Sequence, residues 1–284
     1  MIEKIDLHCH TNASDGAFSP KDIAKRAISR GLSHLAITDH DCVKGIDEAK
    51  ESAKDSSLTI IPGIEISTTW QGAQIHIVGL CLDHNNAALL DLIARQRVKR
   101  ELRAEAIGLK LEKLGFKDAL AKTREQASVG AVITRGNYAR FLVSTGLFSS
   151  TDEAFNKYLK KGGRAYVNTE WIDVKEACEI ILQSGGIPVL AHPKRYTLTN
   201  TKLRKLIEYF KDAGGIALEV ASSQQSPDDR RYLADLCIRY DMYASCGSDF
   251  HTENRWRDLG LNLTLPCSVK PVWTHQKAQE YFKD

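Results

Sequence analysis

Residues 5–10 read Ile5-Asp6-Leu7-His8-Cys9-His10, which is the pattern of a short apolar strand that ends in two histidines. Because alternate residues of a strand point to the same side, His8 and His10 face one centre while Cys9 turns away. Two imidazoles from one strand end form half of a transition-metal site, since neutral nitrogen donors suit zinc, iron or manganese. For this motif alone, two histidines without a metal remain an open alternative.

The sequence after this stretch alternates strand, loop and helix. We expect strands at 34–38, 58–61 and 74–82, and the strand at 58–61 leads through Pro62-Gly63 to residues 64–67. One helix is expected to open at Ser19-Pro20 and to end at Gly31, and a second is expected over roughly 46–55. Polar side chains stand at several predicted strand ends. This order predicts a parallel α/β architecture of the barrel type, in which the functional site collects at the C-terminal ends of the strands.

A helical region interrupts the alternation. The pattern predicts one long helix over 86–114 and further helices to about residue 160, and we interpret 100–165 as a small helical insertion domain. The charge run from Arg95 to Arg100 is most simply a solvated helix face. The barrel pattern is expected to resume at 165–167, so that residues 1–99 and 166–284 form the barrel.

The second half of the predicted barrel repeats the pattern of the first. Its expected strands cover 187–191, 216–220 and 243–247, and its expected helices cover 174–184, 201–213 and 228–240.

Composition excludes several classes of protein. The 284 residues are 43% hydrophobic and 26% charged, as in ordinary globular proteins, and the formal charge of +3 is too small to indicate nucleic-acid binding by itself. No apolar run is long enough for a membrane span, and the chain opens on a charged strand rather than a signal peptide. Seven scattered cysteines without a CxxC pair indicate reduced thiols and a cytoplasmic location.

Nine side chains of the ligand type stand at or near predicted strand ends. They are His8, His10, Asp15, His40, Glu65, His76, His192, Asp249 and His251. Imidazole and carboxylate groups gathered in one pocket must be paired or bound to metal, so the set predicts a metal centre. The other three histidines, His34, His84 and His275, lack this context, and we expect them to be structural.

Five ordered motifs connect the chain to a known family. The His8-Cys9-His10 stretch, Thr38-Asp39-His40, Pro62-Gly63-Ile64-Glu65, Ala191-His192-Pro193 and Ser248-Asp249-Phe250-His251 together resemble the PHP (polymerase and histidinol phosphatase) family of metal-dependent phosphoesterases. The helical insertion further resembles the branch that acts on nucleoside 3′,5′-bisphosphates and on 5′-phosphorylated short RNA.

This resemblance implies a distorted (β/α)7 TIM-like barrel that holds three divalent metal ions. By resemblance, the first metal is bound by His8, His10, Glu65 and Asp249, the second by Glu65, His76 and His192, and the third by Asp15, His40 and His251. The mixed nitrogen and oxygen donors suit Mn²⁺, which we expect first, with Fe²⁺ or Zn²⁺ as alternatives.

Catalytic and substrate-binding residues are assigned on the same basis. The residues expected to carry catalysis are His192, Asp249 and Glu65. Asp39 is expected either to orient a ligand histidine or to cap a turn. Anionic substrate also needs fixed cations or hydrogen-bond donors. The candidates for that role are Arg135 and Asn137 in the insertion, Lys194 and Arg195 after His192, and Lys44.

The function expected from these observations is hydrolysis of a phosphate ester by a metal-activated hydroxide. The substrate would be a small nucleotide 3′,5′-bisphosphate, which loses its 3′-phosphate, or the 5′ end of a short 5′-phosphorylated RNA. Histidinol phosphate phosphatase is one alternative, and a catalytically silent PHP regulatory module is another. No membrane association and no obligatory protein partner is indicated.

Overall fold

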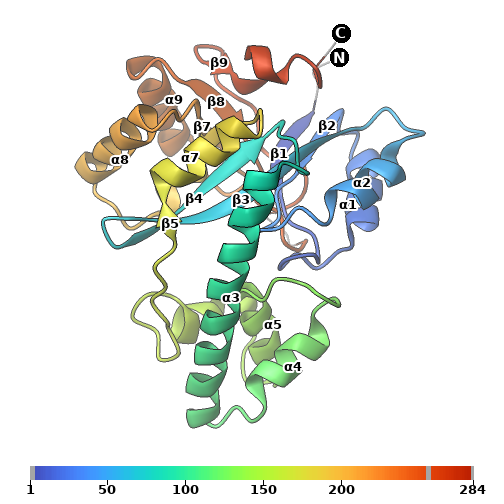
Figure 1. Cartoon of the computed structure of the whole chain (residues 1–284), viewed down its shortest axis with the longest axis vertical. Helices are drawn as coiled ribbons and strands as arrows, with labels where there is room; N and C mark the ends of the chain where they lie inside the picture. The colour runs from blue at the N-terminus through green and yellow to red at the C-terminus, as the bar shows by residue number, and fades with distance from the viewer. Residues whose placement is uncertain (1–3, 254–256, 283–284) are drawn as a thin grey trace.

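The computed structural model describes residues 4–253 and 257–282, and its centre is a curled sheet with helices around it (Figure 1). The strands are β1 (Ile5–Cys9), β2 (His34–Ile37), β3 (Thr59–Trp70), β4 (Ala73–Leu80), β5 (Ile172–Asp173), β6 (Ile187–Leu190), β7 (Ala217–Ala221), β8 (Tyr243–Cys246) and β9 (Lys270–Pro271). The α-helices are α1 (Pro20–Ser29), α2 (Ile46–Ala53), α3 (Ala87–Lys113), α4 (Ala119–Gln126), α5 (Arg135–Ser144), α6 (Thr151–Ala154), α7 (Val174–Gln183), α8 (Asn200–Asp212) and α9 (Pro227–Arg239). Short turns of other helix types are η1 (Phe155–Leu159), η2 (Pro193–Arg195), η3 (Val272–Thr274) and η4 (Gln276–Ala278).

The sheet is parallel except at one strand. Its order is β1-β2-β3-β4-β6-β7-β8-β9, with β5 paired to β3, and β4 runs antiparallel to both of its neighbours. A two-residue turn of Gln71 and Gly72, both with positive φ, joins β3 directly to β4 as a hairpin. The expected alternation of strand and helix is therefore broken here, because a tight hairpin turn leaves no room for a crossover helix.

Strand β3 is longer than the sequence indicated. The predicted end of this strand at residue 61 is wrong, since β3 runs unbroken through Pro62 and Gly63 to Trp70. Pro62 is tolerated because its carbonyl still accepts a hydrogen bond from the Leu82 N–H, while its ring nitrogen needs no partner.

The first strand meets the segment that follows β8. Cys9 and Phe250 form an isolated parallel bridge, the Asp249 N–H donates to the His8 carbonyl (2.8 Å), and the His10 N–H donates to the Phe250 carbonyl (2.9 Å). This bridge joins the two ends of the curled sheet where β1 ends, which brings residues from both ends of the chain to one place.

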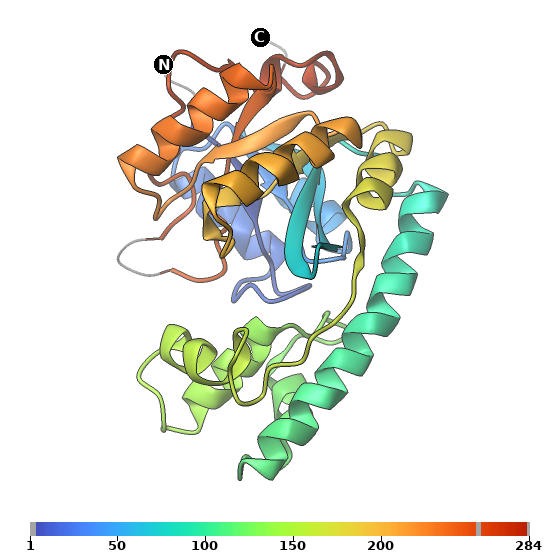
Figure 2. The same cartoon turned by 90° about the vertical axis from the view of Figure 1, so that its left-hand side faces the viewer.

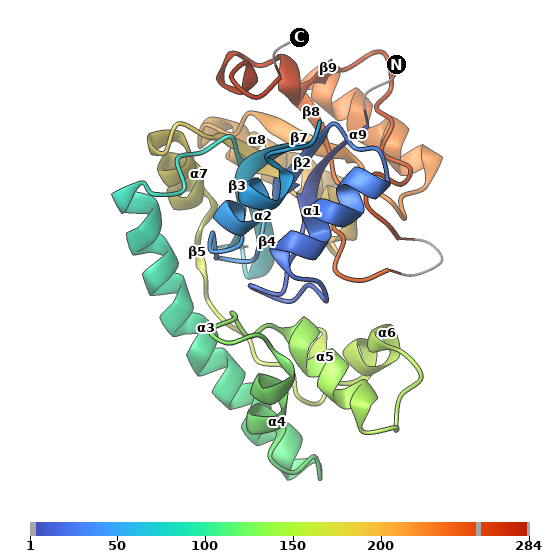
Figure 3. The same ribbon diagram turned by 90° about the vertical axis from the view of Figure 1, so that its right-hand side faces the viewer.

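Helices α4 to α6 lie below the sheet, and α3 runs from beside the sheet down to them (Figures 2 and 3). Helix α3 begins after Asn86, whose side chain accepts hydrogen bonds from the Ala88 and Leu89 N–H groups. The lower helices share a hydrophobic cluster that includes Ile107, Phe116, Tyr138 and Leu142. The predicted boundaries of an insertion at 100–165 stay a prediction.

The connection from these helices back to the sheet differs from the expectation. The predicted strand at 165–167 is wrong, because this segment forms no ladder and the chain rejoins the sheet only at β5, which pairs with β3.

The charge run on α3 is only partly solvated. Arg95 is exposed, but Arg100 is 4% exposed and forms an ion pair with the fully buried Asp41 (Nη2 to Oδ2, 2.6 Å). Gln96 also points inward, where its amide donates to Asp41 Oδ1 and to the Ser67 carbonyl. The prediction of a solvated face is therefore wrong for Gln96 and Arg100, because both meet a carboxylate that follows β2.

Across the described ranges, 4–253 and 257–282, none of the helices has both the length and the apolar composition required to traverse a bilayer.

Candidate metal centre

The nine ligand residues converge at one end of the sheet. Their donor atoms form four groups, and within each group all donor atoms lie within 4.8 Å of one another. The groups are His10, Asp15, His40 and His251; His8, His10 and Asp249; His8, Glu65 and His192; and His40, Glu65 and His76. Parallel strands explain most of this convergence, since β1, β2, β6 and β8 all end here.

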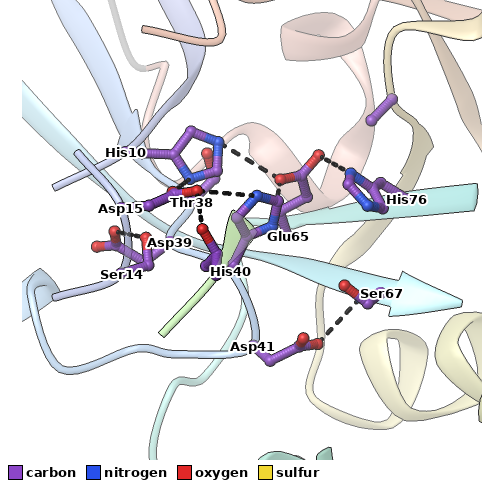
Figure 4. A network of polar contacts seen from close by, with 12 residues as sticks. His10, Ser14, Asp15, Thr38, Asp39, His40, Asp41, Glu65, Ser67 and His76 are labelled. Carbon is purple, nitrogen blue, oxygen red and sulfur yellow. Dashed lines mark hydrogen bonds and ion pairs between the residues drawn. The ribbon is translucent and has the colours of Figure 1, made fainter. Parts of the chain in front are cut away.

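Strands β3 and β4 contribute differently from the others. Glu65 and His76 lie inside their strands rather than at strand ends. In the hairpin register Ser67 pairs with His76, so Glu65 and His76 are diagonal neighbours on one face. Figure 4 shows their side chains pointing toward each other, and the distance from His76 Nδ1 to Glu65 Oε1 is 2.8 Å.

Glu65 is the central carboxylate of the site. Beyond His76, its oxygens lie near His40 Nδ1 (2.8 Å), His192 Nε2 (3.0 Å) and His8 Nε2 (3.3 Å). Burial alone would raise the pKa of Glu65, but the surrounding histidines hold it well below its ordinary value. His10 Nε2 also lies 3.4 Å from Glu65 Oε2, so Glu65 is an ionised carboxylate in contact with five imidazoles.

The second carboxylate, Asp249, completes a triangle with the histidines of β1. The distance from His8 Nε2 to His10 Nε2 is 3.3 Å, and Asp249 Oδ1 lies 3.1 Å from His10 Nε2 and 3.5 Å from His8 Nε2. Donors that share one ion at bond lengths of about 2.0–2.2 Å stand roughly 3–3.5 Å apart, so this triangle has the size of a coordination face. Asp249 also has a positive φ of 51°, a strained conformation for a non-glycine residue.

The third carboxylate, Asp15, lies on the loop after β1. Its Oδ1 is 3.2 Å from His251 Nε2 and 3.9 Å from His10 Nδ1, and its Oδ2 is 3.9 Å from His40 Nε2. The Thr134 hydroxyl donates a hydrogen bond to Asp15, which ties the loop to the first turn of α5. Burial would lower the pKa of His251, but Asp15 and Asp249 raise it to about 9.

The side chains present fit divalent metal ions. Five buried nitrogen and oxygen atoms of the nine predicted ligand residues have no hydrogen-bond partner among the described residues. They are His10 Nδ1, Asp15 Oδ1, His40 Nδ1, Glu65 Oε2 and His192 Nδ1. His40 Nδ1 and Glu65 Oε2 are 2.8 Å apart without hydrogen-bond geometry. Buried polar atoms are normally paired, so lone pairs that converge in this way fit a bound divalent cation.

Glu219 is a member of the site that we did not predict from the sequence. It lies in β7, and its Oε2 accepts a hydrogen bond of 2.7 Å from His8 Nδ1. This contact leaves His8 Nε2 directed at Glu65 and Asp249. The only sequence signal was a carboxylate within the apolar stretch Ala217-Leu-Glu-Val-Ala221, which an alternating strand pattern does not distinguish from a solvated position.

Comparison with known proteins agrees with this geometry. The family model described as the PHP domain matches residues 6–223. The chain belongs to the PHP domain family. The family resemblance inferred from the sequence is thereby confirmed, and so is an α/β fold of the PHP type.

Relatives of this PHP domain protein match it over nearly its whole length. It is 45% identical to a 5′-3′ exoribonuclease from Haemophilus influenzae over 96% of this chain and 99% of the relative. It is 37% identical to a 3′,5′-nucleoside bisphosphate phosphatase from Chromobacterium violaceum over 98% of each. A solved structure described as an amidohydrolase from the same organism, with bound sulfate and no metal, matches with a TM-score of 0.91, 36% identity and 95% coverage of both chains.

Among the predicted cationic residues of this PHP domain protein, two lie next to the ligand residues. Arg195 donates a hydrogen bond to Asp249 Oδ2. Arg135 is the first residue of α5 and donates to Gln74 Oε1 (3.2 Å), and the Gln74 amide is in turn 3.0 Å from His76 Nε2.

Two other predicted lysines lie farther from the ligand residues. Lys194 Nζ pairs with Asp229 (3.2 Å) and lies 4.9 Å from the centre of the Tyr232 ring. Lys44 is exposed beside Gly130, with Nζ 3.7 Å from the point that a Cβ at that glycine would occupy. Their roles in substrate binding stay predictions.

Asn137 and Asp39 both hold the loop that carries Asp15. The Asn137 side chain accepts from the Thr134 N–H (2.8 Å) in a capping box and donates to the Ser14 carbonyl (3.3 Å). The Asp39 carboxylate accepts from the Thr11 N–H, the Thr11 hydroxyl and the Ser14 hydroxyl. Of the two roles considered for Asp39, these contacts support the turn cap.

Proposed function

We propose that this protein is a metal-dependent phosphoric ester hydrolase that acts on nucleotides. Its substrates would be nucleoside 3′,5′-bisphosphates, from which it releases the 3′-phosphate, and short 5′-phosphorylated RNA, from which it removes nucleotides at the 5′ end. The observation that carries the proposal is the convergence of nine buried or half-buried side chains of the ligand type, with Arg195 in contact with one of them, Asp249. The two named relatives support the choice of substrate.

We assign three divalent ions to the centre. His8, His10, Glu65 and Asp249 would hold the first, and Mn²⁺ is the first ion to test, with Fe²⁺ and Zn²⁺ as alternatives. The second ion would be held by Glu65, His76 and His192. The third would be held by Asp15, His40 and His251.

The protein residues supply positioning and charge. Bound metal ions would contribute Lewis-acid charge that makes water a nucleophile at neutral pH and stabilises negative charge on the phosphoryl oxygens. Glu219 fixes the orientation of the His8 ring. Arg195 presents a guanidinium next to Asp249, where it would bind an oxygen of the reacting phosphate. His192, Glu65 and Asp249 are the residues that we propose as catalytic.

The rest of the chain would complete the substrate site. We interpret residues 1–99 and 166–284 as a distorted (β/α)7 barrel that carries the metals, and 100–165 as an insertion that contributes substrate contacts through Arg135. All seven cysteines are unpaired and six are buried, which fits the reducing cytoplasm that we propose as the location.

The test compares three substrates with manganese-loaded protein: adenosine 3′,5′-bisphosphate, a 5′-phosphorylated RNA trimer and histidinol phosphate. We expect phosphate release from the first and 5′-nucleotide release from the second, both lost after chelation and in His192→Ala. Turnover of histidinol phosphate alone would favour the alternative function, a histidinol phosphate phosphatase. Inactivity on all three substrates with metal bound would favour the other alternative, a catalytically silent PHP regulatory module.

A further inference from the structure

The ladder between β4 and β6 ends next to two of the predicted metal ligands. Its last pair is Ile77 with Leu190, so the next pair in register is His76 with Ala191. An antiparallel pair of this kind normally exchanges two N–H···O bonds between the two backbones. Here the Ala191 N–H donates to the His76 carbonyl at 3.1 Å, but a side chain takes the place of the reciprocal bond.

That side chain is Tyr196. Its hydroxyl accepts a hydrogen bond from the His76 N–H (2.9 Å) and donates one to the Ala191 carbonyl (2.8 Å), while the His76 carbonyl lies farther away at 3.4 Å. A hydroxyl is both donor and acceptor, so it satisfies both backbone groups while it holds the two strands apart. The phenol therefore fixes how far β4 and β6 diverge at this end of the sheet.

Both strands carry a ligand assigned to the same ion at this point. His76 lies in β4, and His192 follows Ala191 directly. The centres of the two imidazole rings are 5.3 Å apart, and both rings reach Glu65 Oε1, at 2.8 Å from His76 and 3.0 Å from His192. The Tyr196 ring also lies edge-on to the His192 ring, with 5.4 Å between their centres. One side chain therefore contacts the backbone of one ligand and the ring of the other.

The backbone of His192 needs such a support. Its φ of 30° and ψ of 57° lie in the left-handed region, a strained conformation that persists in a non-glycine residue only where surrounding contacts enforce it. The turn η2 begins at the next residue and ends at Tyr196. The Arg195 N–H closes this turn on the His192 carbonyl (2.9 Å), and the Tyr196 hydroxyl fastens its far end to β4. The bend that directs His192 at Glu65 is thereby held at both ends.

We propose that Tyr196 is a positioning residue for the second metal ion: its hydroxyl sets the separation of His76 and His192, and with it the affinity of the site that these histidines form with Glu65. This inference rests on the proposed function for the assignment of that ion. Tyr196 acts through the two ligands, because its hydroxyl is already bonded to two backbone groups. Packing requires only the aromatic ring, so phenylalanine at this position separates positioning from packing.

The test removes the hydroxyl and keeps the ring. Full-length wild type and Tyr196→Phe, both freed of metal, are titrated with Mn²⁺, and the free ion is measured by electron paramagnetic resonance. The same titration of His76→Ala identifies which bound ion depends on His76. We expect Tyr196→Phe to weaken the binding of that ion about 10- to 100-fold, the usual loss when a contact that orients a metal ligand is removed. The other ions should bind with wild-type affinity.

Tyr209→Phe is the matched control. Tyr209 packs against the same hydrophobic cluster as Tyr196, but its hydroxyl donates to Asp173 Oδ1 (2.7 Å), which is not a predicted ligand. This variant should bind every ion as wild type does. Wild-type affinity for the His76-dependent ion in Tyr196→Phe would overturn the proposal. An equal loss at every ion would also overturn it, because such a loss would show that the hydroxyl only supports the fold.

A double-mutant cycle separates positioning from overall stability. Residues that act on one site are not additive, so Tyr196→Phe introduced into His76→Ala should cause no further loss of affinity for the ions that remain. A further loss at those ions would contradict the proposal. Absence of turnover by manganese-loaded wild type would instead refute the proposed function, while the titrations would still decide the role of Tyr196.

Discussion

His8 donates a hydrogen bond from Nδ1 to Glu219 Oε2 at 2.7 Å, although the two residues are 211 positions apart in the chain. Both side chains are at most 2% exposed. The contact selects the His8 tautomer whose Nε2 lone pair faces Glu65 and Asp249. Glu219 is therefore a positioning residue for the predicted metal ligand.

We predict that Glu219→Gln weakens metal binding about 10- to 100-fold, the usual effect of losing a carboxylate behind a ligand histidine. The amide can still pack in the same space, so the fold should survive. Metal content after dialysis against buffered Mn²⁺ measures the effect. Glu208→Gln, a substitution on the surface of α8, serves as the control. Wild-type affinity in Glu219→Gln would show that the histidine is oriented by other contacts.

A substitution in α5 tests whether the Asp15 site depends on the lower helices. A Cβ at Gly136 would lie 2.7 Å from Asp15 Oδ2, so Gly136→Ala must displace that carboxylate. Helix propensity alone would make this change stabilising by up to about 1 kcal/mol. We nevertheless expect the metal affinity of the Asp15 site to fall about 10- to 100-fold.

Competition titration with a chelating dye would measure this loss at the Asp15 site. Thr134→Ser, which keeps the hydroxyl that donates to Asp15, should retain wild-type affinity. Gly136→Ala protein that binds metal normally would mean that Asp15 is not a ligand.

The Asp41–Arg100 pair should be the most sensitive link between the sheet and α3. Asp41→Asn leaves the Arg100 guanidinium buried without its charge partner, which costs about 3–5 kcal/mol in the free energy of unfolding. Urea denaturation measures that free energy. Asp91→Asn removes the exposed partner of Arg95 on the same helix and should cost less than about 1 kcal/mol. Similar losses in the two variants would contradict the importance of the buried pair.

The stability of the protein should depend on pH through Asp258. Burial tends to raise the pKa of this carboxyl, but hydrogen bonds from Arg26 and from the Leu259 N–H lower it below the ordinary 3.8. A carboxyl with a lowered pKa stabilises the folded state above its unfolded pKa, and that contribution is lost as the pH falls through the folded value.

Asp258→Asn should therefore destabilise the protein by about 1 kcal/mol at pH 7, and the difference from wild type should shrink as the pH falls below about 4 and disappear once the pH is below the lowered folded-state pKa. Denaturant melts across this pH range measure the difference. The exposed Asp235→Asn is the control and should show no such trend. A gap between wild type and Asp258→Asn that persists in acid would contradict the role assigned to the carboxylate.

Local patterns predicted much of the fold and most of the residues that gather at the site. The alternation in residues 5–10 placed His8 and His10 correctly on one side of a strand, and helix α3 was predicted within one residue of its observed start and end. Strand-end logic does not account for Glu65 or His76, which lie inside a hairpin. Both were included as side chains near predicted strand ends, and the resemblance to the PHP family implied the same two residues.

The features that the sequence did not reveal depend on contacts between distant segments. Glu219 and Asp41 are acidic residues in ordinary local contexts, and their roles follow only from His8 and Arg100 approaching in space. The direction of β4 was missed because a Gln71-Gly72 turn has a weaker sequence signature than Asn-Gly or Asp-Gly. Burial of Arg103 likewise depends on how α3 packs on Trp171.

The bridge between Cys9 and Phe250 joins two segments that lie far apart in the chain, so the metal centre can form only after both have been synthesised. Asp249 and His251 follow His8 and His10 by more than 230 positions. A ribosome-bound or prematurely terminated chain that stops before Asp249 therefore lacks two of the nine predicted ligand residues, however well its first strands have folded. We expect such a truncated chain to lack hydrolytic activity until synthesis has passed His251.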